Sequence, residues 1–165
     1  MQPDRPPIDP DVDLQVPGQR TELRQGTASL LAAVAAGGVV GGLARHGLTV
    51  AWPYPPRGFP WAIFTVNVSG CLLIGVLMVL VTEVWRAHRL VRPFLGTGLL
   101  GGYTTFSTYA VQVQQAVAVG AVRTGLLYLA GTLLTALAAV WVGMALTRLA
   151  TGREPHPGRR GSELT

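Results

Sequence analysis

A run of glycine, hydroxyl-bearing and aromatic residues interrupts the third of four apolar segments in this 165-residue chain. The run extends from Gly96 to Tyr109, and its centre, Gly101 to Thr108, reads Gly-Gly-Tyr-Thr-Thr-Phe-Ser-Thr. Two glycines followed closely by two β-branched threonines make a poor helix sequence. At membrane depth, freed backbone groups are tolerated only where protein or a polar cavity satisfies them. The run therefore predicts a helix that breaks near its middle and forms a site for an ion or a substrate.

Side chains that could bind a small ion follow directly after the predicted break. Phe106 and Tyr109 are three residues apart, so they share one face if a helix resumes there. Ser107 and Thr108 lie between them and supply hydroxyl groups. Aromatic pairs at this spacing commonly serve only to pack helices together. Here the neighbouring hydroxyl groups favour a role in binding.

Three other polar residues stand out in the remaining apolar segments. Asn67 in the second segment could bond to a neighbouring helix or turn its amide N–H groups toward an anion, and both interpretations stay open. Tyr128 and Thr132 are four residues apart on one face of the fourth segment, where they could line the same cavity or bond back to the helix backbone. Arg45 lies near the far end of the first segment, a position that favours a side chain snorkelling to the membrane interface.

The interiors of the four segments contain no Asp, Glu, Lys or His. Proton-coupled transport needs a titratable group inside the membrane, and hydrolysis or metal chemistry needs acids, bases or ligands. Amide, hydroxyl and aromatic-edge donors instead suit the passive conduction of a small anion. The sequence therefore predicts a conduction path rather than an enzyme.

Four helices must position these residues. The apolar segments cover about 27–50, 61–82, 93–121 and 123–149, each long enough at 1.5 Å per residue to cross a hydrocarbon core of about 30 Å. Two overlapping GxxxG spacings, from Gly37 to Gly42, predict close helix packing in the first segment. We expect an all-α membrane protein with a four-helix domain at 27–150 and disordered polar tails at 1–26 and 151–165.

The net charge of +5 comes from arginine alone, because the chain has no lysine. Near the membrane ends, about nine arginines lie on one side and three on the other; the smaller set is Arg45, Arg57 and Arg123. This bias predicts that both termini are cytoplasmic in a multi-pass protein of the cell membrane. The basic residues are expected to contact anionic head groups, and no patch of the kind that binds nucleic acid is visible.

The quoted motifs together resemble the CrcB/Fluc family of fluoride channels. The resemblance rests on Gly41-x-x-x-Arg45, on Thr65 to Gly70, and on Gly98 to Thr108, and it covers about residues 26–150. It implies a dimer of two four-helix subunits inserted antiparallel, with two fluoride pores. It also implies a structural sodium ion at the dimer centre, held by the backbone carbonyls of Gly101 and Thr104 in each subunit.

The resemblance also implies a role for each candidate residue. Asn67 would be the pore amide, Phe106 the first pore aromatic, and Arg45 the arginine near the vestibule. Ser107 and Thr108 would add hydroxyls, while Tyr128 and Thr132 would form the polar track of the fourth helix. Two positions depart from the family pattern: Tyr109 replaces the usual second phenylalanine, and Gln112 stands where glutamate is frequent. These departures bear on conduction rate and selectivity.

We therefore expect a channel that lets cytoplasmic fluoride leave passively. A small multidrug-type exporter is the alternative from another class, disfavoured because the first segment lacks a carboxylate. A non-conducting subunit of a heterodimeric channel is a third possibility. Because the arginine bias predicts one fixed orientation, we expect pairing with an oppositely inserted paralogue, with an antiparallel homodimer as the other arrangement.

Overall fold

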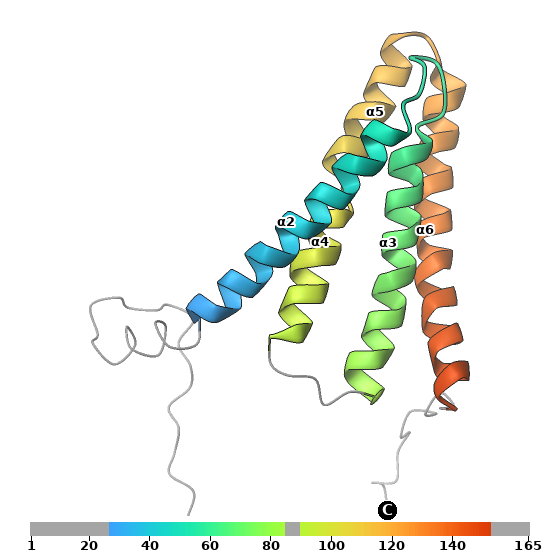
Figure 1. Ribbon diagram of the computed structural model, residues 1–165. Coiled ribbons are helices and arrows are strands. Elements are labelled where there is room, and N and C mark those ends of the chain that lie inside the picture. Colours follow the sequence, from blue (N-terminus) through green and yellow to red (C-terminus); the bar gives the residue numbers. More distant parts are fainter. Residues whose placement is uncertain (1–26, 85–89, 153–165) are drawn as a thin grey trace, which may run out of the picture.

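The computed structural model describes residues 27–84 and 90–152, and every regular element within these ranges is helical. The predicted N-terminal tail, most of the predicted C-terminal tail and part of the charged connection at 83–92 lie outside the described residues. The elements, in order, are α2 (Ala28–Ala51), α3 (Trp61–Val79), η2 (Leu80–Val84), η3 (Pro93–Leu100), α4 (Gly101–Tyr103), α5 (Ser107–Ala118) and α6 (Val122–Thr151). The chain runs back and forth, so the α2–α3 and α5–α6 connections lie at the same end of the molecule (Figure 1).

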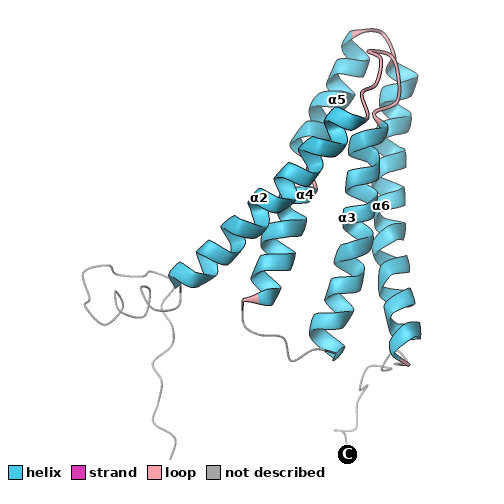
Figure 2. Cartoon of the chain, in the orientation of Figure 1, coloured by secondary structure: helices cyan, strands magenta, loops and turns pink. Residues whose placement is uncertain are grey.

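Short connections separate the helices, as Figure 2 shows. α2 ends at Ala51, two residues before Pro53, which cannot donate a backbone hydrogen bond. Gly120 in the α5–α6 connection and Gly152 after α6 have φ values of 76° and 66°, a left-handed conformation that costs glycine little. The short connections therefore make helices that follow one another in the sequence run in opposite directions.

Three of the described helices are long and apolar enough to cross a membrane: Ala28–Ala51, Trp61–Val84 and Val122–Thr151. The third predicted segment is different, because it is divided into η3, α4 and α5. η3 is a π-helix, and residues 104–106 between α4 and α5 are not helical. The all-helical fold and the predicted break are thus confirmed, and the break lies at Thr104 to Phe106.

Glycines set two close helix contacts. A Cβ atom added to Gly37 or Gly41 would collide with the backbone of Phe94 or Leu99, respectively, so α2 packs backbone to backbone against η3. A Cβ atom at Gly38 or Gly42 would meet no atom within 4 Å. The Gly37–Gly41 spacing makes this contact with η3, whereas Gly38 of the other spacing lies against Gly102 of α4, where a Cβ atom on Gly102 would meet the Gly38 backbone. α3 and α6 pack in the same way through Gly75 and Gly143.

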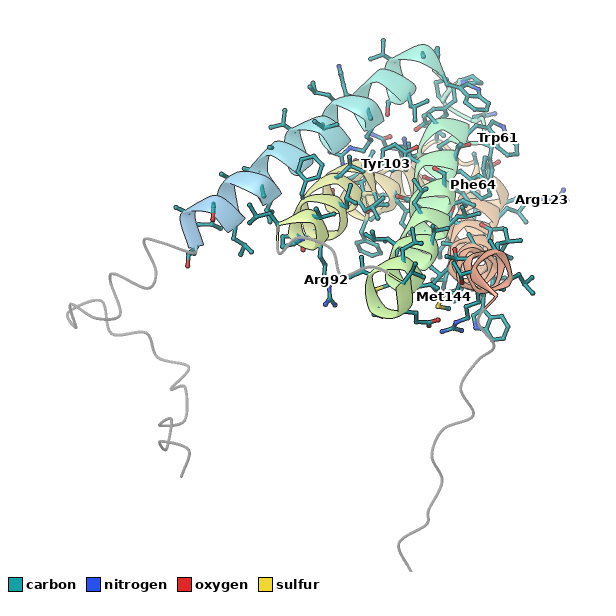
Figure 3. The ribbon with its side chains drawn as sticks, turned by 60° about the horizontal axis from the view of Figure 1, so that its bottom comes forward. Trp61, Phe64, Arg92, Tyr103, Arg123 and Met144 are labelled. Carbon is teal, nitrogen blue, oxygen red and sulfur yellow. The ribbon has the colours of Figure 1, made fainter. Side chains whose placement is uncertain are left out.

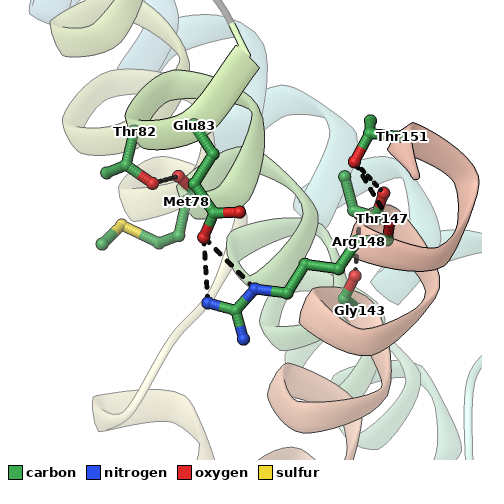
Figure 4. A network of polar contacts seen from close by, with 7 residues as sticks. All are labelled: Met78, Thr82, Glu83, Gly143, Thr147, Arg148 and Thr151. Atoms are coloured by element: carbon green, nitrogen blue, oxygen red, sulfur yellow. Dashed lines mark hydrogen bonds and ion pairs between the residues drawn. The ribbon is translucent and has the colours of Figure 1, made fainter. Parts of the chain in front are cut away.

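One ion pair closes the end of the molecule opposite to the α2–α3 connection. Arg148 of α6 donates to Glu83 Oε1 of η2 from Nη2 at 2.9 Å and from Nε at 3.2 Å (Figure 4). Thr82, Thr147 and Thr151 beside this pair donate their hydroxyls to carbonyls of their own helices. The pair joins the ends of the second and fourth segments.

Candidate functional site

The break changes the backbone partners of the third segment. Thr104 adopts an extended conformation with ψ of 160°. In a continuous α-helix, the N–H groups of Thr105 and Thr108 would donate to the carbonyls of Gly101 and Thr104. Here Thr105 N–H donates to Asn67 Oδ1 at 2.9 Å, and Thr108 N–H donates to Thr105 Oγ1 at 3.2 Å. The break therefore releases the carbonyls of Gly101 and Thr104 from the helical pattern.

Asn67 holds the break from the neighbouring helix α3. Besides accepting from Thr105 N–H, its Nδ2 atom donates to the Thr105 carbonyl at 3.0 Å. The Asn67 amide thus pairs with both the N–H and the carbonyl of Thr105. Of the two interpretations of Asn67, the hydrogen bond to a neighbouring segment is therefore observed. An amide nitrogen carries two N–H groups, and the Thr105 carbonyl takes one of them.

Arg45 reaches the break from α2. Its Nη1 atom donates to the Thr104 carbonyl at 3.2 Å, and the side chain is partly buried. The Arg45 guanidinium group thus has a protein partner at the break, which the snorkelling expectation did not include. A cationic group therefore lies against the break, in a chain whose described spans otherwise carry neutral donors there.

A cluster of hydroxyls begins the helix after the break. Thr105 Oγ1 is 3.3 Å from Ser107 Oγ and 3.1 Å from Thr108 Oγ1, and Thr105 itself is buried. Sequence reasoning chose Ser107 and Thr108 but missed Thr105 as the centre of the cluster. The signal was present, because a threonine three residues before an N–H group of the first helical turn is a typical N-cap.

Phe106 at the end of the break and Tyr109 in α5 are neighbours with different surroundings. Their ring centroids are 5.9 Å apart, as the spacing predicted. The Phe106 side chain is 79% exposed, whereas Tyr109 is buried and donates its hydroxyl to the Leu129 carbonyl of α6 at 2.6 Å. The hydroxyl that distinguishes this chain from the family pattern therefore bonds to the helix backbone.

Tyr128 and Thr132 are both buried on α6. The Tyr128 hydroxyl donates to Gln112 Oε1 at 2.9 Å, and its ring centroid is 5.1 Å from that of Tyr109. Thr132 Oγ1 is buried and has no hydrogen-bond partner among the described residues. It does not bond back to its own helix. A buried hydroxyl without a protein partner costs free energy unless a water or a ligand satisfies it.

Another polar contact across the break escaped sequence reasoning. The hydroxyls of Ser69 in α3 and Tyr103 in α4 are 3.0 Å apart, and Tyr103 is labelled in Figure 3. With Asn67, Ser69 makes a second polar attachment of α3 to the third segment. The described residues contain no group of three or more His, Cys, Asp or Glu that could hold a metal ion.

A cavity of about 400 Å³ lies where the α2–α3 connection meets α5. The connection contributes Tyr54, Pro56 and Pro60, and α5 contributes Gln112 and Gln115. Of these residues, Gln112 also contacts Tyr128, so the cavity adjoins the buried polar residues of the site.

Comparison with known proteins identifies the family. Residues 32–144 match the family described as CrcB-like protein, Camphor Resistance (CrcB). The chain is 54% identical over 125 residues to the fluoride-specific ion channel FluC 2 of Streptomyces avermitilis, which covers 76% of this chain and 79% of that protein. It is 55% identical over 124 residues to FluC 2 of Nocardia farcinica, covering 75% and 89%. It is 57% identical over 115 residues to FluC 1 of Streptomyces coelicolor, covering 70% and 75%. The chain therefore belongs to the CrcB family, a family of membrane ion channels rather than enzymes.

Proposed function

We propose that this protein is a fluoride channel through which cytoplasmic fluoride leaves the cell passively. The observation that carries the proposal is the break at Thr104 to Phe106, held by Asn67, in a chain whose similar proteins are named fluoride-specific ion channels. The family leaves the multidrug-type exporter without support.

Neutral donors replace the hydration shell of fluoride along the proposed path. Thr132 Oγ1 is a buried hydroxyl without a partner, and the Asn67 amide retains a second N–H group beyond the one that Thr105 accepts. The positive edge of the Phe106 ring and the hydroxyls of Ser107 and Thr108 add further donors, and Tyr109 and Tyr128 line the path with their rings. Such donors bind an anion while letting it leave, as conduction requires.

The same break supports the proposal of a structural sodium ion. Sodium is a hard cation that prefers oxygen ligands, and the carbonyls of Gly101 and Thr104 are released from the helical pattern. A carbonyl oxygen has two lone pairs, so Thr104 can accept from Arg45 and still coordinate an ion. The bound ion would supply positive charge that joins the broken segments of two subunits.

A second subunit inserted antiparallel is part of the proposal. The 79% exposed ring of Phe106 and exposed leucines of α2 and α6 leave an extensive apolar surface for a partner or lipid. The partner is a paralogue in the opposite orientation if the arginine bias fixes the orientation of this chain. Streptomyces avermitilis has two proteins that are similar to this chain, FluC 2 and FluC 3. The presence of two such paralogues in one organism supports the proposal that paralogues pair.

Fluoride efflux from liposomes tests the function. The purified protein, alone and with a paralogue, is reconstituted, and fluoride and chloride release are followed with ion-selective electrodes. We expect fluoride release without chloride release, and loss of fluoride release in Phe106→Ile. Trp141→Leu is the matched control, because Trp141 on α6 is similarly exposed at 75%. Absence of fluoride release under both conditions would contradict a conducting role and favour a non-conducting subunit.

A further inference from the structure

Only one side chain belongs to α4, the short helix that ends at the break. Its residues are Gly101, Gly102 and Tyr103, so Tyr103 alone can hold this turn through a side chain. The carbonyls of Gly101 and Thr104, the proposed sodium ligands, belong to the residues on either side of Gly102 and Tyr103. The peptide units between them are planar, so a rotation of the turn changes the directions of both carbonyl groups. The contacts of Tyr103 therefore bear on the geometry of the break.

Helix α2 holds α4 through close backbone packing. A Cβ atom on Gly102 would collide with the backbone of Gly38, and a Cβ atom on Gly41 would collide with the backbone nitrogen of Tyr103. Packing of this kind fixes the distance between two backbones. A hydrogen bond, in contrast, also requires a narrow range of directions.

Helix α3 supplies this directional contact. The hydroxyls of Ser69 and Tyr103 are 3.0 Å apart. The next residue of α3 is Gly70, where a Cβ atom would collide with Cγ2 of Thr104 and would lie 3.4 Å from Cδ1 of the Tyr103 ring. The absence of a side chain at Gly70 therefore leaves room for the Tyr103 ring to lie against α3 and reach Ser69.

The neighbouring hydrogen bonds determine which of the two hydroxyls donates. A serine hydroxyl carries a single proton. Ser69 Oγ lies 2.6 Å from the Thr65 carbonyl and 3.3 Å from the Val66 carbonyl, and a carbonyl can only accept. The shorter of these bonds takes the serine proton, so Tyr103 is the donor to Ser69. The result is a chain from the Tyr103 hydroxyl through Ser69 to the Thr65 carbonyl, in which each bond polarises the next.

The other attachments of the break lie after Tyr103 in the sequence. Arg45 donates to the Thr104 carbonyl, and Asn67 pairs with the N–H and the carbonyl of Thr105. The bond from Tyr103 to Ser69 fastens the turn that comes before these residues. The Gly101 and Thr104 carbonyls are therefore held from both sides of the break.

We propose that Tyr103 is a positioning residue, whose hydroxyl bond to Ser69 sets the directions of the Gly101 and Thr104 carbonyls and thereby strengthens sodium binding at the break. The inference rests on the proposed structural sodium ion and extends it to two side chains that need not touch the ion. A phenylalanine would fill the same space as Tyr103 but could not donate.

A sodium titration of thermal stability tests this role. The full-length protein, alone and with a paralogue as in the liposome assay, is purified in detergent. Its unfolding midpoint is measured as sodium chloride replaces N-methylglucamine chloride at constant ionic strength. A ligand that binds only the folded protein raises the midpoint once its concentration exceeds the dissociation constant. The sodium concentration at which the midpoint begins to rise therefore reports sodium binding separately from stability without sodium.

Tyr103→Phe keeps the ring beside Gly70 and removes the donor. We expect the rise to begin at a sodium concentration roughly threefold to tenfold higher than in the native protein, the range that the loss of one hydrogen bond produces in an equilibrium constant. Ser69→Ala should shift this onset by a similar factor. The double variant should shift it no further than either single variant, because all three lose the same bond.

Thr147→Val is the matched control, because it also removes a hydroxyl that donates to a carbonyl, that of Gly143 at 2.7 Å within α6. It should lower the midpoint at every sodium concentration and leave the onset unchanged. The same behaviour in Tyr103→Phe, or additive shifts in the double variant, would overturn the positioning role while leaving the sodium ion in place. A native midpoint that does not respond to sodium would overturn the proposed ion and this inference with it, whereas the liposome assay tests fluoride conduction independently.

Discussion

The side chain of Asn67 has one observed role and one proposed role. It pairs with the N–H and the carbonyl of Thr105, and we propose that its second amide N–H group faces the conducted ion. In a membrane an unsatisfied peptide group is costly, so the pairing with Thr105 stabilises the break itself. Loss of conduction in an Asn67 variant therefore has two physical causes, and a stability measurement separates them.

Asn67→Leu should lower both stability and fluoride release. Leucine removes both hydrogen bonds to Thr105 and leaves two peptide groups unpaired, which costs about 1–3 kcal/mol for each buried group. Thermal unfolding in detergent measures the loss. Thr135→Val is the control, because the Thr135 hydroxyl is exposed and bonds only within α6. An unfolding midpoint equal to that of the native protein would contradict the role of Asn67 in holding the break.

Tyr109→Phe should separate the ring from its hydroxyl. The variant keeps the ring beside Phe106 and Tyr128 but removes the 2.6 Å bond to the Leu129 carbonyl. We expect a loss of about 1 kcal/mol in stability, the usual net value of one hydrogen bond, with fluoride release retained. Unfolding and electrode measurements on the same preparation test this. Loss of fluoride release at unchanged stability would show instead that the hydroxyl contacts the ion.

At the scale of the helices, the sequence revealed the break more easily than its surroundings. Adjacent glycines and β-branched threonines weaken a helix wherever they occur, so the interruption near Thr104 could be predicted from local propensity. The bond from Arg45 to the Thr104 carbonyl joins residues 59 positions apart. Such a contact depends on how α2 crosses the third segment, and no local pattern in either segment records that crossing.

The two GxxxG spacings of α2 also show that a local sequence pattern does not reveal which residues contact a neighbouring helix. Their sequences are equivalent, yet Gly41 packs against the Leu99 carbonyl whereas Gly42 has open space beside it. Gly41→Ala should destabilise the protein by about 1–3 kcal/mol through overpacking. Gly42→Ala should be neutral or stabilising by up to about 1 kcal/mol, because alanine favours the helix. Thermal unfolding of the two variants compares them, and equal losses would contradict the observed packing.

For the molecule as a whole, the distribution of arginines along the chain predicts its orientation in the membrane. Arg92 caps the start of η3 and Arg148 lies in the last turn of α6, at one end of the molecule. Arg57 in the α2–α3 connection and Arg123 in the first turn of α6 lie at the other end, so these four arginines are balanced. The bias comes from Arg20, Arg24, Arg86, Arg89, Arg153, Arg159 and Arg160, which are outside the described residues. The predicted orientation therefore depends on arginines in the two tails and in the connection between the second and third segments.

If these arginines set the orientation, removing them should let the chain insert in both orientations. Fusions of a cytoplasmic and a periplasmic reporter to the C-terminus should report only the cytoplasmic location for the native chain. Changing Arg86 and Arg89 to glutamine, with both tails shortened to residues 27–152, removes the whole excess, so both reporters should then become active. Arg57→Gln with Arg123→Gln is the control, because it increases the bias and should leave one location. Equal activity of both reporters in the native chain would contradict a fixed orientation and favour an antiparallel homodimer over pairing with a paralogue.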